Sequence, residues 1–225
     1  MREPTTQVSE PRHCEATALR TAQGIQYGQV MSVNRLRGTV QLDPTRRSYL
    51  RLAEPSDGPL IYRLRSDPRL SRFLNAPPTS LPEQVSWLTR YKDDEAAGRQ
   101  YYFIIVSAGQ DRGTVRMYDF RTINGLQSFC WGSWIIAPPP VIGLASYSAL
   151  AVCELGFEHL GFEHAHFDVR RENQNVVDFH LRSGAEIIDE NDQDYFFHFS
   201  RAAYDAFKDS QRQTIERHSA QQRAS

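Results

Sequence analysis

Hydrophobic and polar positions are most informative between Ser128 and Ala185, where they predict a strand, a helix and a second strand in succession. The aromatic and β-branched run Phe129–Ile136 is typical of a strand, and the three prolines after it end that strand because proline lacks the N–H group of a ladder. The apolar, alanine-rich run Leu144–Leu160 predicts a largely buried helix, and His164–Arg170 predicts the next strand. These segments together predict a βαβ unit.

A glycine-bearing turn joins the first strand of this unit to its helix. Gly143 precedes the apolar run, and the N-terminus of the helix that follows carries free N–H groups, which favour a phosphate. A further helix, from about Asn173 to Ser183, follows the second strand and is closed by Gly184. We expect the rest of the chain to support a pocket at this turn.

The patterns outside the βαβ unit predict further strands and helices that complete one sheet. Turns between strands are expected at Asp111–Gly113 and at Asn124–Gly125. The order of elements indicates an α+β fold with a mixed sheet. The expected elements are strands at 49–53, 101–106, 114–120, 186–189 and 195–199, and helices at 56–66, up to 74, at 80–98 and from 201.

The pattern also divides the chain into one domain with a tail at each end. Residues 1–46 hold few large aliphatic side chains and are expected to form a mobile tail, with a short strand around Thr39–Leu42. Residues 47–208 are expected to form the folded domain, and residues 209–225 a second tail. Exposed aromatic residues such as Tyr101 and Tyr102 would suit a dimer seam, although a monomer is equally consistent.

Composition narrows the class of protein. The 225 residues carry a formal net charge of -1, and the isoelectric point is about 6.7, so neither a nucleic acid nor a membrane is an expected partner. No apolar run approaches the roughly 20 residues of a membrane span, and no secretion signal is recognisable at the N-terminus. The three cysteines lie far apart without a CxxC spacing, which predicts reduced thiols and a cytoplasmic protein.

Four short segments, at fixed distances from one another, carry a resemblance to a known family. They are Gly132–Ile135, Val141–Ala145, Asn173 and Phe179–Ala185. In this combination the chain, from about residue 49 to residue 204, resembles the GNAT superfamily of acyl-CoA N-acetyltransferases. The N-terminal half is similar to a branch that includes ribosomal-protein and amino-sugar acetyltransferases, and the segment around the βαβ unit is most similar to enzymes of bacterial surface-polysaccharide pathways.

The resemblance implies a mixed, mostly antiparallel sheet of about six to seven strands flanked by helices. It further implies that the strands Phe129–Ile136 and His164–Arg170 splay apart, and that the acetyl-pantetheine arm of acetyl-CoA, the co-substrate, lies between them. By this resemblance the arm pairs with the backbone of Trp134, Ile135 and Ile136. The pyrophosphate binds backbone amides of the turn and the helix start, namely Val141, Ile142, Gly143, Leu144, Ala145 and Ser146. Asn173 fixes the loop or a pantetheine amide, or caps the helix that follows it.

The turn departs from the family pattern at its first residue. Pro140 stands where an arginine or glutamine is usual, and Val141 stands where a second glycine is common. Proline removes one amide and any side-chain charge, but the remaining amides and the helix dipole, worth about 0.3–1 kcal/mol for an exposed anion, can still hold a phosphate. The alternative is that the proline-rich turn blocks the site.

Two catalytic roles follow from the resemblance. His180 occupies the position of the family's tyrosine. One expectation is that it acts as a general acid towards the coenzyme A sulfur, since an imidazole donates a proton near neutral pH. The other is that it is a packed structural histidine. Cys130 replaces the usual acidic base. Asp119, Asp168 and His166 are therefore the candidate bases, with a water chain as the alternative. His164, His166 and Asp168 share one strand face at a chelating spacing, but the family needs no metal and none is expected.

The resulting hypothesis is an N-acetyltransferase that acts on the primary amine of an amino-sugar, by direct attack in a ternary complex. The acceptor is expected to be a small molecule, nucleotide-linked in one version of the hypothesis, with Arg65, Arg69 and Arg72 as candidate phosphate ligands. The alternatives are an acetyltransferase of protein N-termini and a non-catalytic acyl-CoA-binding module.

Overall fold

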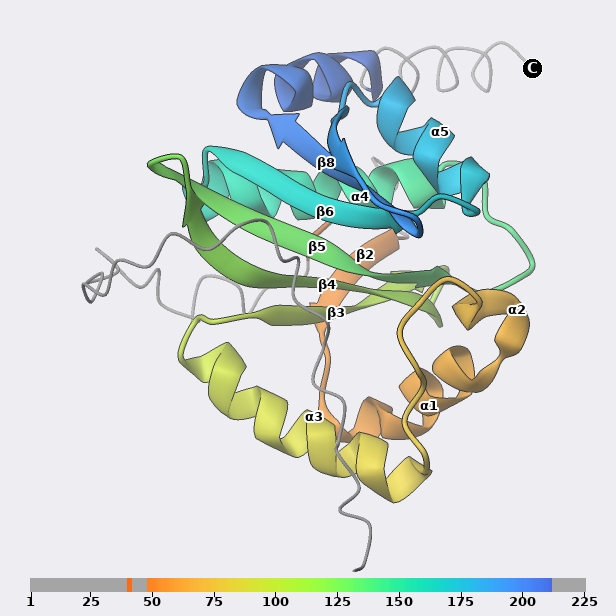
Figure 1. The fold of residues 1–225 in the computed structure, drawn as a ribbon. Coiled ribbons are helices and arrows are strands. Elements are labelled where there is room, and N and C mark those ends of the chain that lie inside the picture. Colours follow the sequence, from red (N-terminus) through yellow and green to blue (C-terminus); the bar gives the residue numbers. More distant parts are fainter. Residues whose placement is uncertain (1–39, 42–47, 212–225) are drawn as a thin grey trace, which may run out of the picture.

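The computed structural model describes residues 40–41 and 48–211 of the chain (Figure 1). One eight-stranded sheet with the order β1-β2-β3-β4-β5-β6-β8-β7 forms its centre. Neighbouring strands are antiparallel except β5 and β6, which are parallel. The strands are β1 (Val40–Gln41), β2 (Ser48–Leu52), β3 (Tyr101–Ser107), β4 (Gln110–Ile123), β5 (Leu126–Ile136), β6 (His164–Arg170), β7 (Glu186–Glu190) and β8 (Asp194–Ser200).

Helices cover both faces of the sheet (Figure 1). The helices are the 3-10 turn Pro55–Asp57, α1 (Gly58–Ser66), α2 (Pro68–Ser71), α3 (Leu81–Ala96), α4 (Leu144–Glu154), the π-helical turn Leu155–His159, α5 (Gln174–Arg182) and a last helix over residues 201–211. The α+β architecture and the βαβ unit β5-α4-β6 that the sequence predicts are confirmed.

The two cores lie on opposite faces, because successive side chains of a strand point to opposite sides. On β3, Tyr101 and Phe103 belong to the larger core beneath α4 and α5, whereas Tyr102 and Ile104 pack against α1 and α3. Tyr101 and Tyr102 are both buried in this way, so the expectation of exposed aromatic side chains there was wrong. The face that carries α1 and α3 is called the acceptor face below.

The turn expected at Asp111–Gly113 lies elsewhere. The chain reverses at Ala108 and Gly109, both with positive φ, and Ser107 pairs with Gln110 across this two-residue hairpin. Gly113 instead lies inside β4, where a Cβ atom would come within 2.0 Å of the Ile135 carbonyl oxygen. The glycine therefore permits a close approach of two strands and does not form a turn.

Both predicted tails lie mostly outside the described residues. Of the first, residues 40–41 form β1, within the short strand expected around Thr39–Leu42. Within the described part of the chain, no helix is long and apolar enough to cross a membrane.

Candidate active site

The parallel strands β5 and β6 form a fork. They pair at three positions, and the last pair joins Cys130 to His166. Beyond it β6 pairs with β8, while β5 continues to Ile136 beside β4. Among the described strands, none pairs with the β5 edge that faces β6. The splay that the resemblance implies is present, and it begins immediately after Cys130.

Two β-bulges lie beside the fork. The register of β4 against β5 shifts between Thr114 and Arg116 and again between Tyr118 and Arg121. Ser133 on β5 and Asp119 on β4 adopt positive φ at these places, which bends the strands locally. Asp119 lies at the second of these bulges, where its carboxylate contacts His166 of β6.

The turn after β5 leads directly into the N-terminus of α4. Gly143 adopts a left-handed conformation at φ 78°, where a Cβ atom would also approach the Tyr147 ring to 2.8 Å. The Leu144 N–H donates to the Val141 carbonyl and Gly143 provides no side-chain cap, which leaves the first-turn amides that follow without an intrahelical acceptor. These amides, of Ala145 and Ser146, are among those predicted to bind the pyrophosphate.

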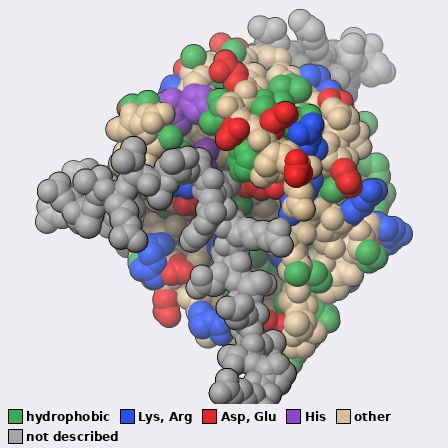
Figure 2. Space-filling view, viewed as in Figure 1, with side chains coloured by type: hydrophobic (Ala, Val, Ile, Leu, Met, Phe, Trp, Pro, Cys, Tyr) green, Lys and Arg blue, Asp and Glu red, His purple; other side chains and the backbone are tan. Residues whose placement is uncertain are grey.

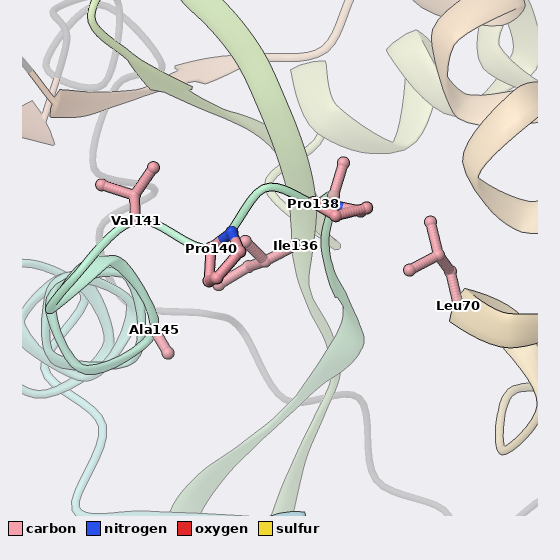
Figure 3. A pocket seen from close by; sticks show the side chains of 7 residues that line it. Leu70, Ile136, Pro138, Pro140, Val141 and Ala145 are labelled. Carbon is pink, nitrogen blue, oxygen red and sulfur yellow. The ribbon is translucent and has the colours of Figure 1, made fainter.

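The proline run does not fill the space at this turn. A cavity of about 410 Å³ lies between the turn, α2 and the start of α4 (Figure 3). Three predicted cofactor residues line it, namely Ile136, Val141 and Ala145. Sequence reasoning missed the opposite wall, where Leu70 of α2 faces Pro138 across the opening. The remaining lining residues are Ala137 and Pro140.

His180 lies on α5 among aromatic rings at the fork. Its ring centroid is 4.2 Å from that of Phe167, 5.3 Å from Trp131 and 5.4 Å from Phe179. Burial lowers the pKa of His180 to about 3, so the imidazole is neutral at pH 7. Of the two roles expected for His180, this pKa favours the packed structural histidine over the general acid, because the imidazolium form is not populated near neutral pH.

The structure brings two of the predicted base candidates into contact. His166 Nε2 lies 3.2 Å from Asp119 Oδ2, and His166 Nδ1 lies 2.7 Å from the hydroxyl oxygen of Ser128. His166 is 6% exposed and has both ring nitrogens engaged, whereas Asp119 is exposed and also lies 3.5 Å from Arg121. His166 can therefore influence a substrate only through Asp119.

Asp168, the third candidate, lies at the fork itself. It follows His166 by two residues on the same face of β6, just beyond the last β5–β6 pair, and it is exposed. Figure 2 shows acidic side chains gathered over the region of β6, β7 and β8, with histidines beside them. Arg170 pairs with Asp194 and Arg171 with Glu190 in this region, so part of its negative charge is already compensated.

Tyr118 of β4, which sequence reasoning missed, reaches across β5 near the start of the fork. The Tyr118 hydroxyl hydrogen-bonds Cys130 and lies 3.0 Å from the position that a Cβ atom of Gly132 would take. The charge of Cys130 and burial, with a contribution from Asp168, hold the pKa of Tyr118 well above its usual value, so the phenol stays protonated. The guanidinium of Arg116 lies 4.8 Å from the ring centroid and fixes it. A glycine inside a strand is the signal that could have revealed this close approach.

Comparison with known proteins identifies the fold and the family. A family model described as an acetyltransferase (GNAT) domain matches residues 47–186. The chain is a GNAT acetyltransferase. A solved structure described as apo FdhC, a nucleotide-linked sugar GNAT, is 38% identical, with a TM-score of 0.66 over 73% of this chain and 92% of that one. No curated protein matches the chain by sequence.

Two further GNAT structures share the fold at lower identity. RimL, a ribosomal-protein alpha-N-acetyltransferase, is 15% identical with a TM-score of 0.60, over 72% of this chain and 94% of that one. The N-acetyltransferase PseH of Campylobacter jejuni is 16% identical with a TM-score of 0.53, over 69% of this chain and 99% of that one. At these identities the likeness concerns the fold of the acetyltransferase and not its substrate.

The arginines expected to hold phosphates are engaged within the acetyltransferase. Arg65 donates to the carbonyl oxygens of Asn75 and Ala76, and so holds the loop before α3. Arg69 forms a two-pronged pair with Asp67, and Arg72 lies 3.6 Å from Glu172. These pairs make a phosphate site at this helix face less favourable than the sequence suggested.

Asn173 stands at the N-cap of α5, as expected, but its side chain makes no capping hydrogen bond. Its predicted contact with the cofactor stays a prediction. The histidines of the β6 face are used in pairs: His166 contacts Asp119, and His164 Nδ1 hydrogen-bonds His198 Nε2. Among the described residues, no three His, Cys, Asp or Glu side chains are grouped to hold a metal.

Proposed function

We propose that this GNAT acetyltransferase moves an acetyl group from acetyl-CoA to the primary amine of an amino-sugar carried on a nucleotide. The observation that carries the proposal is the 38% identity to a structure described as a nucleotide-linked sugar GNAT, 92% of which the alignment covers. Because this identity extends over 73% of the chain, we take the sugar nucleotide as the first acceptor class to test.

The residues at the fork fit an acyl-CoA as co-substrate. The β5 edge from Trp134 to Ile136 offers backbone groups to the amides of the pantetheine arm, since no strand that the structure describes occupies that side. The uncapped amides at the start of α4 offer donors to the pyrophosphate, favoured by the helix dipole. The cavity at the turn provides the entry between them.

The acceptor face supplies the proton chemistry. In the proposal, the ammonium group of the sugar binds Asp168, which receives one proton and releases it to solvent. Asp168 is preferred over Asp119 because it lies beyond the last β5–β6 pair, where the reacting carbonyl of an acyl-pantetheine in the fork would lie. Asp119 is held by His166 and Arg121 and contributes negative potential.

The reaction then balances without a covalent enzyme intermediate, by direct attack in a ternary complex. The amine nitrogen forms a bond to the thioester carbonyl carbon, the carbon–sulfur bond breaks, and the thiolate takes the second proton that the nitrogen loses. The neutral imidazole of His180 beside the fork can take part only as a hydrogen-bond partner. One proton is released to solvent for each amide and thiol formed.

Binding and turnover test the proposal separately. Acetyl-CoA should raise the melting temperature, since a ligand at a hundredfold excess over its Kd stabilises the fold by about 2.7 kcal/mol. UDP- and dTDP-linked amino-sugars should then produce thiol release, while the matched hydroxy-sugar nucleotides should not. Turnover of peptides with free N-termini instead would overturn the acceptor class, and binding of acetyl-CoA without turnover of any amine would favour a non-catalytic module.

A further inference from the structure

One buried hydrogen-bond donor at the fork has no acceptor in the described part of the protein. Trp131 is 6% exposed, and its indole nitrogen Nε1 makes no hydrogen bond to any residue within 40–41 or 48–211. Native proteins satisfy nearly all buried polar groups, because an unmade hydrogen bond away from water costs free energy. An orphan donor of this kind points to a partner that binds later.

The indole lies where β5 and β6 part. Trp131 is the first β5 residue beyond the last β5–β6 pair. Its ring centroid lies 5.4 Å from that of Trp134 on β5, 5.7 Å from Phe167 on β6 and 5.3 Å from His180 on α5. The three elements that bound the fork therefore all contribute a ring around this one side chain.

The next tryptophan along the strand provides a contrast. Trp134 Nε1 donates to the hydroxyl oxygen of Ser148 at 3.1 Å, so the fold satisfies that indole internally. The rings around Trp131 offer mostly apolar carbon, and His180 Nδ1 and Nε2 form no hydrogen bond with it. The two indoles thus differ in whether the N–H group has an acceptor, which is the property that a bound ligand would change.

We propose that the Trp131 Nε1–H donates a hydrogen bond to a carbonyl oxygen of the acyl-pantetheine arm when that arm lies in the fork. The inference rests on the proposed function, because it requires that the chain bind an acyl-CoA. Carbonyl oxygens are the acceptors that such an arm presents, one in the thioester and two in its amides. A donor held in an apolar, water-poor site binds such an oxygen more strongly than water does.

The indole N–H can be observed directly. The chain contains three tryptophans, Trp87, Trp131 and Trp134, so protein labelled with ¹⁵N-indole tryptophan gives three side-chain signals, assigned with Trp→Phe variants. On titration with acetyl-CoA, we expect the proton signal of Trp131 to move downfield. Movement with acetyl-CoA alone assigns the thioester carbonyl as the acceptor, and movement with both acetyl-CoA and CoA assigns a pantetheine amide. A Trp131 signal that moves with neither ligand, although calorimetry detects binding, overturns the inference.

An atomic substitution tests the energetic side. Benzothienylalanine keeps the bicyclic shape of tryptophan and replaces the N–H group by sulfur. At position 131 it should weaken acetyl-CoA binding about 3- to 10-fold, the range expected for one hydrogen bond, and leave the melting temperature of the ligand-free protein unchanged or raised. The same replacement at Trp87, on α3, should leave the affinity unchanged.

The outcomes separate this inference from the proposed function. Wild-type protein that binds no acyl-CoA would contradict the proposed function before the tryptophan is tested. Wild-type binding with an unchanged affinity in the position-131 protein would overturn the inference and leave the function standing. A lowered melting temperature without ligand, together with unchanged affinity, would indicate a packing role for Trp131 and would also overturn it.

Discussion

The two ends of the β5–β6 pair use their polar side chains in opposite ways. At the closed end, where residues 128–130 pair with residues 164–166, Ser128, His166 and Asp119 satisfy one another in a chain of hydrogen bonds. At the open end, beyond the last pair, the Trp131 N–H has no acceptor among the described residues, and burial keeps His180 uncharged. The polar side chains at the closed end thus satisfy one another. At the open end Trp134 donates to Ser148, and the Trp131 N–H is the one donor that we propose a ligand satisfies.

The largest expected effect is on turnover and comes from the acceptor side of the open end. Replacing Asp168 by Asn removes the proposed proton acceptor and should lower kcat about 10²- to 10⁴-fold, with the melting temperature unchanged because the side chain is exposed. Asp192→Asn, an exposed carboxylate in the β7–β8 turn, is the matched control and should keep full activity. A fully active Asp168→Asn enzyme would indicate that Asp119 or water, and not Asp168, accepts the proton.

The second prediction concerns the pH dependence of stability at the open end. The pKa of His180 in the folded protein, about 3, lies below the ordinary value of about 6.5, so between these values the unfolded chain binds a proton that the native protein does not. The stabilisation is therefore complete above about pH 6.5 and is lost, at about 1.4 kcal/mol per pH unit, as the pH falls toward 3.

Replacing His180 by Phe should abolish this component. Urea unfolding between pH 4 and pH 8 measures it, and the difference in unfolding free energy between wild type and His180→Phe should be constant above pH 7 and change below it. Parallel curves over the whole range would mean that the imidazole is solvated in the native protein, and the contrast between the two ends of the fork would weaken.

The third prediction tests the closed end. Ser128→Ala leaves His166 Nδ1 buried beside a methyl group, and an unsatisfied buried polar group costs about 1–3 kcal/mol in unfolding free energy. Ser86→Ala, at an exposed position within α3, should change the free energy little, since alanine favours the helix. Equal free energies for the two variants would show that water replaces the lost hydroxyl.

The architecture could be predicted from the sequence because the local signals around β5 and α4 agree with one another. The proline run ends β5, and the alanine-rich run and Gly143 define α4, so the βαβ unit follows from neighbouring residues alone. The misplaced hairpin turn shows the limit. Gly113 serves a contact between β4 and the Ile135 carbonyl, and that contact depends on strand register, which a local pattern does not contain.

The site was predicted only where it coincides with family positions. The residues of the turn lie at such positions, and Asp168 was chosen as a neighbour of one of them, Cys130; the structure places them around the fork. The roles of Tyr118 and Trp131 depend on segments that are distant in the chain. Tyr118 reaches over Gly132 from β4, and the position of Trp131 at the fork depends on where β6 separates from β5. The pKa of His180 likewise depends on burial among rings from three elements, so residue type alone left its role open between a general acid and a packed histidine.

The smallest expected effect comes from the ion pair that links the segment after α2 to the loop after β6. Arg72 lies 3.6 Å from Glu172, and the side chains are 67% and 79% exposed, so solvent screens the pair. Arg72→Gln should change the unfolding free energy by less than about 0.5 kcal/mol, measured beside Arg90→Gln on the exposed face of α3. A larger loss would mean that surface charge holds the open end together. A negligible loss of unfolding free energy, with the affinity for acetyl-CoA unchanged, would mean that the backbone bulges and the aromatic cluster, and not this ion pair, set the width of the fork.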